Sequence, residues 1–232
     1  MNQLLNMTGG ATMNNLNLLI LITNADNEKK HLHILDNYKP MFNLVTYGVG
    51  TASSSVLEYF GLNTLEKKVI FTILPRVTSK YALLDLQSDL NKHGMGIAFT
   101  IPLSSSTKYM QEVYKEDIRK DVIMDKTNQH LIITITNEGY ADAVMTAAKK
   151  AGAMGGTTIS GRGLETDKVV KFLGISIVPE KDVVLILASD EIKNNIMNSI
   201  VNDCGLKTEG AGICFSLPVE DAVGLKKELN IK

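Results

Sequence analysis

Hydrophobic and polar positions follow the same order of spacings twice along the chain. Short runs rich in β-branched and aromatic residues indicate strands, and apolar residues three or four positions apart indicate helices. In the first half the pattern predicts strands at 17–23, 44–47, 69–74 and 97–101 and helices at 28–37 and 79–92. In the second half it predicts strands at 131–136, 157–160, 183–188 and 213–217 and helices at 140–151 and 191–204. Each half therefore has the order β-α-β-β-α-β.

Glycines and short motifs also recur between the halves. Ile22-Thr23-Asn24 matches Ile135-Thr136-Asn137, and the pair Gly94 and Gly96 matches Gly210 and Gly212. Because glycines in register need a backbone reason, we interpret the chain as a tandem duplication. The order of elements predicts an α+β fold of two tandem ferredoxin-like sandwiches, each with two helices on one face of a four-stranded sheet. The other face of such a sheet must be buried elsewhere, which predicts assembly into a homo-oligomer, a trimer or a dimer.

The same pattern sets the expected domain limits. Residues 1–14 have no sustained period and are expected to form a flexible leader. Residues 15–104 form the first domain, and residues 130–232 form the second. The polar stretch 105–129 is expected to be a linker, with a helix over 109–118.

Composition narrows the possible partners. The chain has 232 residues, a net charge of −1, few aromatic residues and no Trp, which argues against a nucleic-acid partner. Cys204 and Cys214 fall in a helix pattern and a strand pattern, so we expect buried thiols in a reducing cytoplasm and no disulfide. The apolar run 16–22 is too short to span a bilayer, and no basic residue precedes it, which argues against a signal peptide.

One motif near the end of the chain goes beyond the general fold. From Gly210 to Ala222 the sequence reads Gly-Ala-Gly-Ile-Cys-Phe-Ser-Leu-Pro-Val-Glu-Asp-Ala. This resembles the nitrogen-regulatory PII signal-transduction family, in which a Gly-x-Gly loop enters the last strand and Leu-Pro-Val, two acidic residues and Ala follow. Gly161-Arg162-Gly163 fits the root of that family's long flexible loop. The resemblance covers residues 130–226 and is weaker in the first half.

The resemblance implies a non-enzymatic regulator. Proteins of this family are usually trimers that bind ATP or ADP between subunits and signal to a target protein through the flexible loop; a membrane transporter is a candidate target. No obligatory cofactor or metal is implied, and residues 164–179 match the responsive loop. The nucleotide-binding positions that it implies here are Gly161, Arg162, Gly163, Gly210, Gly212 and Lys226.

The chain also departs from the family pattern. The position of Ala211 is usually acidic and that of Ile213 is usually a phosphate-binding Lys. Loss of such a charged contact costs about 1.5–3 kcal/mol, which is about 10- to 150-fold in affinity. Arg162 could supply the missing cation, with a solvated surface Arg as the alternative. Both glycine loops also have a purely structural explanation, because turns after strands often need a positive φ.

Other readings of the chain stay open. A ligand-free interaction module fits the lost charges, and a ferredoxin-like regulator that binds amino acids or metal ions, in the manner of ACT-type domains, fits the fold. His31 and His33 do not share a helix face, so we expect surface histidines and no metal. We interpret Glu220 and Asp221 as a capped terminal turn and not as an acid/base pair. No catalytic motif is present, and we expect no enzyme.

Overall fold

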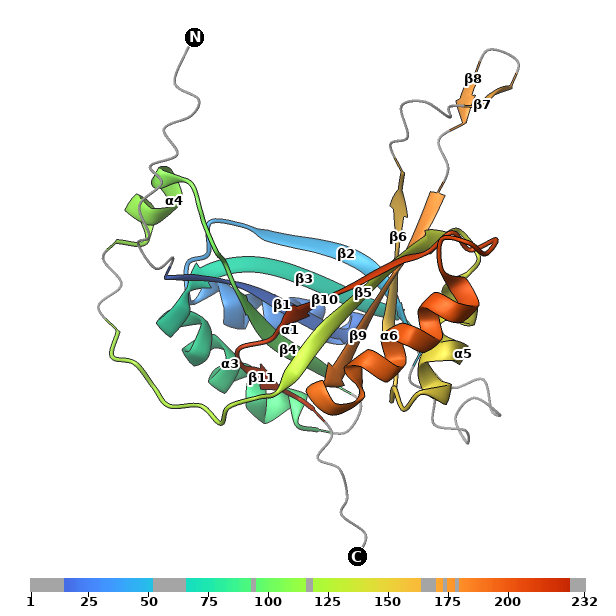
Figure 1. Cartoon of the computed structure of the whole chain (residues 1–232). Helices are drawn as coiled ribbons and strands as arrows, with labels where there is room; N and C mark the ends of the chain where they lie inside the picture. Colours follow the sequence, from blue (N-terminus) through green and yellow to red (C-terminus); the bar gives the residue numbers. More distant parts are fainter. Residues whose placement is uncertain are drawn as a thin grey trace, which may run out of the picture. The chain divides into compact units, whose positions relative to one another are not determined.

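The computed structural model describes residues 15–51, 66–92, 95–115, 119–163, 170–172, 175–177 and 180–225. The first half contains β1 (Leu16–Asn24), a 3₁₀ turn η1 (Ala25–Asn27), α1 (Glu28–Asp36), β2 (Asn43–Gly50), β3 (Glu66–Pro75), α3 (Arg76–Leu90) and β4 (Gly96–Pro102). The connecting stretch holds α4 (Lys108–Val113). The second half contains β5 (Gln129–Asn137), α5 (Ala141–Lys150), β6 (Thr157–Arg162), β9 (Glu180–Ser189), α6 (Asp190–Cys204), β10 (Ile213–Pro218) and β11 (Ala222–Val223). Figure 1 labels these elements along the chain.

The strand order confirms the ferredoxin-like class in both halves. The first half has the order β4-β1-β3-β2, and the second has β10-β5-β9-β6. In both cases the fourth strand of the half lies beside the first, and the third lies between the first and the second. This is the arrangement of a βαββαβ sandwich, in which each helix returns the chain across one face of the sheet.

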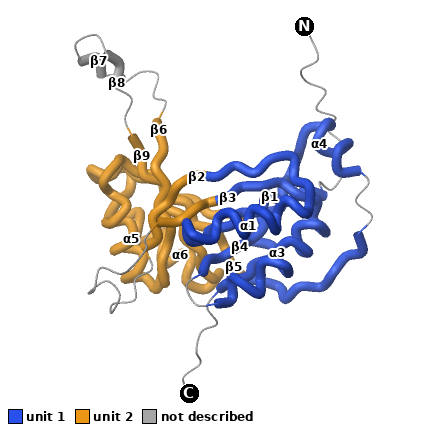
Figure 2. Tube along the Cα trace, turned by 180° about the vertical axis from the view of Figure 1, so that it is seen from behind, with its two compact units in different colours: residues 1–45, 70–127, 219–232 blue, residues 46–69, 128–218 orange. Residues whose placement is uncertain are grey.

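Contacts divide the chain into two compact units, drawn in blue and orange in Figure 2. Unit 1 consists of residues 1–45, 70–127 and 219–232, and unit 2 consists of residues 46–69 and 128–218. Two segments therefore group with the opposite half of the sequence. In unit 2, Thr51 donates its backbone N–H to Gly156 O at 2.9 Å. In unit 1, β11 pairs with β4 through Ala222 opposite Phe99.

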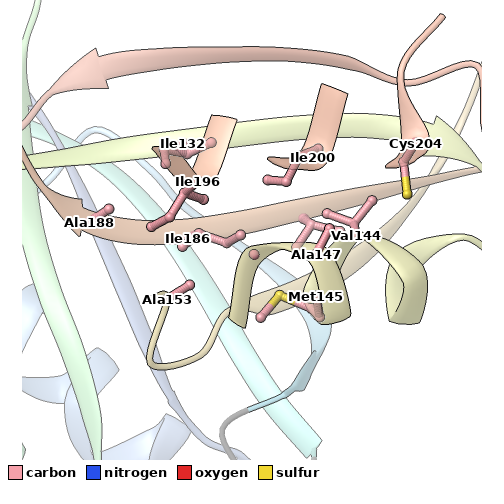
Figure 3. Close-up of a cluster of buried hydrophobic side chains, with 12 residues drawn as sticks. Ile132, Val144, Met145, Ala147, Ala153, Ile186, Ala188, Ile196, Ile200 and Cys204 are labelled. Carbon is pink, nitrogen blue, oxygen red and sulfur yellow. The ribbon is translucent and has the colours of Figure 1, made fainter. Parts of the chain in front are cut away.

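The core of unit 2 lies between its sheet and its two helices. Figure 3 shows Ile132 and Ile186 from the sheet facing Val144 of α5 and Ile196 of α6. These side chains are fully buried because every second strand residue and one helix stripe face the same layer. Cys204 belongs to this cluster as a buried free thiol, as predicted from its helical pattern.

The core of unit 1 is built in the same way. Leu19 and Leu21 of β1 pack with Leu83 and Leu86 of α3. Leu84 does not share this helix face, because it lies one residue, or about 100° of helix, beyond Leu83, and it is 39% exposed. The helix also begins at Arg76, three residues before the predicted start, directly after Pro75.

The helix ends and the connecting segment largely agree with the predictions. Gly152 follows α5 with φ 102°, which is the left-handed cap that glycine favours. In the linker, α4 covers part of the expected helix, and Thr107 accepts a hydrogen bond from Met110 N as its N-cap. Between β6 and β9, where only a loop was expected, β7 (Val170–Phe172) and β8 (Ile175–Ile177) form a hairpin.

The sheet faces that lie away from the helices are covered unequally. In unit 1, Ile20, Phe99 and Ile101 alternate with the helix-facing residues, yet they are buried. In unit 2, the corresponding residues of β10 are exposed: Ile213 by 45% and Phe215 by 40%. No helix within the described residues is long and apolar enough to cross a membrane.

Candidate functional site

The two glycine motifs of the second half lie at the same end of one sheet but on strands β6 and β10, which are not neighbours. In the antiparallel register, Gly161 faces Lys181, and Lys181 faces Asn137 on the next strand. On the far side of that strand, Ile213 at the start of β10 faces Ile135. The order β10-β5-β9-β6 puts three strand spacings between the motifs, about 14 Å. One copy of this sheet does not bring them together.

The first motif ends strand β6. Arg162 faces Glu180 of β9 and is exposed to solvent, and Gly163 follows the strand. Gly161 has no positive φ. A Cβ added there would meet nothing nearer than the side chain of Val183, at 3.8 Å. The turn explanation is therefore wrong for Gly161, and neither backbone conformation nor packing requires a glycine at this position.

The second motif is held by bonds within the chain. Ala211 N donates to Thr208 O at 3.1 Å, and Gly212 N donates to Cys204 O at 2.8 Å. A Cβ on Gly212 would lie 2.4 Å from that same Cys204 oxygen, so this glycine is required for close packing. The positive φ of the loop, 45°, belongs to Ala211, whereas Gly210 and Gly212 have none. The turn explanation is wrong in detail here as well, and two backbone donors of the expected phosphate cradle already have acceptors.

A row of hydrogen-bonded side chains runs between the two motifs. Lys181 Nζ donates to Asn137 Oδ1 at 2.9 Å, and Asn137 Nδ2 donates to Glu209 O at 2.9 Å. Tyr140 OH donates to Glu209 Oε2 at 3.0 Å, and this bond raises the pKa of Tyr140. Sequence reasoning assigned these residues no role. The recurrence of Ile-Thr-Asn was the signal that pointed to Asn137.

Asp182 fixes the start of α5 from the neighbouring strand. It is buried, and its Oδ2 accepts the backbone N–H of Gly139 at 2.9 Å and of Ala141 at 3.1 Å. The helix has no side-chain cap of its own, because Tyr140 occupies the N-cap position. A carboxylate that binds the free N–H groups of a helix start replaces that cap.

Part of the predicted site falls outside the described residues. Lys226, the expected cation on the β10 side, lies there. So does most of the expected responsive loop 164–179, apart from the β7–β8 hairpin.

Two glycines of the first half, Gly48 and Gly96, are accounted for by packing. Gly96 has φ 149°, and a Cβ on it would lie 2.3 Å from Ile22 O. Gly48 lies inside β2, where a Cβ would come within 2.9 Å of the methyl group of Thr157. Gly94 lies outside the described residues. Near these glycines, the exposed cation Lys92 forms an ion pair with Asp89 at 2.8 Å.

His31 was expected at the surface, and this is wrong. It is fully buried, with Nδ1 2.8 Å from Thr23 Oγ1 and Nε2 3.8 Å from Asp89 Oδ2. Burial lowers the pKa of His31. Hydrogen bonds from Lys30 and Lys92 lower the pKa of Asp89 to about 2. The histidine belongs to the packing of α1 against α3, and no group of three or more metal-ligating side chains occurs among the described residues.

Glu220 and Asp221 do not cap a terminal turn. Glu220 forms an ion pair with Arg76 and accepts a hydrogen bond from Asn17 Nδ2 at 2.8 Å. Asp221 is buried, which raises the pKa of its carboxyl group. The backbone of this segment exchanges hydrogen bonds with Thr100 of β4. Both residues hold the segment to unit 1.

No family model and no curated protein matches this sequence. Among solved structures, Arabidopsis thaliana PII bound to citrate is 23% identical, with a TM-score of 0.32, 41% of this chain covered and 78% of that chain. A Bacillus cereus protein related to NIF3 is 13% identical, with a TM-score of 0.30, 44% of this chain covered and 28% of that chain. A microcompartment protein from Desulfitobacterium hafniense is 10% identical, with a TM-score of 0.25, 89% of this chain covered and 96% of that chain. The fold assignment rests on the strand orders described above.

Proposed function

We propose that this chain is a non-enzymatic, PII-like regulatory protein that binds a small anionic ligand, with ATP or ADP as the candidate effector. Binding would be read out by a target protein through the segment 164–179, which follows Gly163 in the chain. A membrane transporter is the candidate target by resemblance. The site would need neither a metal nor a permanent cofactor.

One observation carries the proposal: Gly161 lacks a structural reason to be a glycine. Its backbone is extended and its surroundings leave room for a side chain. Glycine at such a position lets another molecule approach the main chain closely. The neighbouring Arg162 is exposed and carries the positive charge that a phosphate or carboxylate ligand requires. Lys181 faces Gly161 from the next strand, on the opposite face of the sheet from Arg162, and its Nζ donates to Asn137 Oδ1.

The separation of the two glycine motifs supports an oligomeric site. The motifs lie on strands β6 and β10 of the same sheet, about three strand spacings apart. A ligand within one copy therefore contacts one motif, and a ligand that contacts both would need motifs from different copies. This supports a homo-oligomer, dimer or trimer, as the form that binds.

The test is calorimetric titration of the whole chain with ATP and with ADP, each with and without Mg²⁺. We expect saturable binding that Arg162→Ala weakens about 10-fold or more, because a charge-assisted contact is worth about 1.5–3 kcal/mol. Lys150→Ala is the matched control. Lys150 is also a cation, but it is the last residue of α5, at the end of the helix away from Asp182. Binding that Arg162→Ala leaves unchanged would remove Arg162 from the site. No binding at millimolar nucleotide would reject nucleotide sensing.

A ligand-free interaction module is the second candidate. The N–H groups of Ala211 and Gly212 donate to acceptors within the chain, so they do not offer the phosphate cradle that the resemblance implies. If the titrations show no heat and no nucleotide raises the unfolding temperature, this candidate stands. Binding to the folded state at 100 times Kd would stabilise it by about 2.7 kcal/mol, which a thermal scan detects readily.

A further inference from the structure

The outer edge of β10 is a strand edge of the kind that natural proteins usually cover. β10 (Ile213–Pro218) is the terminal strand of its sheet and pairs only with β5 among the described residues. Its sequence, Ile-Cys-Phe-Ser-Leu-Pro, contains no charged residue. Exposed strand edges are normally protected by charges, bulges or very short length, and here only the final Pro218 serves that purpose. Ile213 and Phe215 are 45% and 40% exposed beside this edge.

The chain itself shows what an edge of this composition needs. β4 (Gly96–Pro102) is the corresponding fourth strand of the first half and is equally uncharged. Its outer edge is covered by β11, with Ala222 and Val223 opposite Phe99 and Ala98. Thr100 N also donates to Asp221 O at 2.9 Å. Residues 221–223 are therefore already bound to β4. Within the described residues no equivalent segment covers β10.

We propose that the β10 edge is an interface between two copies of this chain, which pair their β10 strands antiparallel about a two-fold axis. The nine-stranded sheet of a second copy ends at β10 and at the two-residue β11, so within the described residues β10 is the longer terminal strand of that sheet. The pairing brings no like charges together, because neither strand carries a charge. This goes beyond the proposed ligand site and specifies the homo-oligomer as a dimer. In that dimer a ligand at Gly161 and Arg162 is held without the β10 motif, because β6 of one copy lies more than three strand spacings from β10 of the other.

Symmetry fixes the register. A two-fold axis normal to the sheet joins the two sheets with their equivalent faces on the same side. Two residues can therefore stand directly opposite each other only if their side chains project from the same face. Centring the axis on Phe215 pairs the most residues while leaving Pro218, which has no N–H, outside the ladder. Phe215 then faces Phe215 of the second copy, and Ile213 faces the second copy's Leu217. The exposed apolar residues of the two copies are buried against each other.

The first test is the mass of the whole chain in solution by sedimentation equilibrium. We expect a dimer, and we expect Phe215→Lys to raise the dimer dissociation constant about tenfold or more, because an edge lysine opposes pairing. Tyr109→Lys is the matched control, since Tyr109 is an aromatic residue 66% exposed on α4, and it should keep the wild-type mass. A wild-type monomer or trimer, or a folded Phe215→Lys protein with unchanged mass, overturns the proposal. Far-UV circular dichroism verifies folding of each variant.

The second test addresses the register. Facing Cβ atoms of an antiparallel pair lie about 4.5–5.5 Å apart, close to the range of a disulfide. Phe215→Cys should therefore form a covalent dimer on mild oxidation. The wild type should not, because this register places Cys214 opposite Ser216, and Tyr109→Cys should not either. A dimer in which Phe215→Cys fails to cross-link overturns this register even if Phe215→Lys proves too unstable to study. Neither test uses nucleotide, so failure here is distinguishable from failure of the ligand proposal.

Discussion

Replacing Gly161 and Gly212 by Ala, one at a time, separates a glycine kept for an approaching molecule from a glycine required by the fold. At Gly161 the new methyl group would lie 3.8 Å from the nearest heavy atom, a side-chain carbon of Val183. At Gly212 it would lie 2.4 Å from Cys204 O, which belongs to the backbone. The two substitutions add the same atom in opposite environments.

The two substitutions should have different effects on the free energy of unfolding. An Ala that fits the existing backbone reduces the entropy of the unfolded chain, so Gly161→Ala should leave stability unchanged or raise it by about 0.4–1 kcal/mol. Gly212→Ala forces Cys204 O or the loop to move, at a cost of about 1–3 kcal/mol for overpacking. The hydrogen bond from Gly212 N to Cys204 O, worth about 0.5–1.5 kcal/mol, is strained or lost with it. A total loss of about 2–4 kcal/mol follows for Gly212→Ala.

Urea unfolding followed by circular dichroism measures both effects. With a slope of about 2 kcal/mol per molar urea, the midpoint of Gly212→Ala should fall by about 1–2 M, while that of Gly161→Ala stays within about 0.5 M of the wild type. The ligand titration described above should show the reverse ranking, with Gly161→Ala losing affinity. Equal destabilisation by both variants would refute the claim that Gly161 has no structural requirement.

Three further predictions follow from the buried groups. Because burial lowers the pKa of His31, the unfolded chain binds a proton more readily than the folded chain, and stability should fall as the pH drops below about 6.5. The urea midpoint should therefore fall between pH 7.5 and pH 5, and it should fall less in His31→Leu. An equal fall in both proteins would contradict this origin. Asp182→Ala leaves two N–H groups at the start of α5 without their acceptor and should cost about 1–2 kcal/mol in thermal unfolding, with the exposed Glu138→Ala as the near-neutral control. Ile186→Ala truncates a fully buried side chain and should lower the free energy of unfolding by about 2–5 kcal/mol in urea. Leu206→Ala, at a residue 70% exposed, should change it by no more than about 0.5 kcal/mol. Similar losses in both variants would place Ile186 outside the core.

The sequence was a good guide to the elements and to the class of fold. The strands at Leu16–Asn24 and Gln129–Asn137, for example, agree with their predictions to within two residues. This succeeds because spacing and strand propensity act over a few neighbouring residues. The order of elements then predicted the ferredoxin-like arrangement, in which two helices lie on one face of each sheet.

Individual environments were harder to predict. His31 shares a helix with exposed residues, and only its contact with Thr23 and Asp89 from other elements shows that it is buried. The glycine motifs were expected to act through their backbone conformation, but Gly212 is required by one carbonyl oxygen and Gly161 by nothing within the fold. Such requirements depend on atoms far away along the chain, which a local pattern does not contain.

The amino-acid sequence by itself determined which segments become strands and helices, because periodicity and propensity are local properties. Tertiary structure alone decided that residues 46–51 and 66–69 group with unit 2 and that Ala222 and Val223 extend the sheet of unit 1. It also decided that the two glycine motifs stand on separate strands of one sheet, β6 and β10, and that β10 keeps an uncovered edge among the described residues. Strand pairing joins residues that are distant in sequence, and the choice of partner depends on competition among all the strands of the fold.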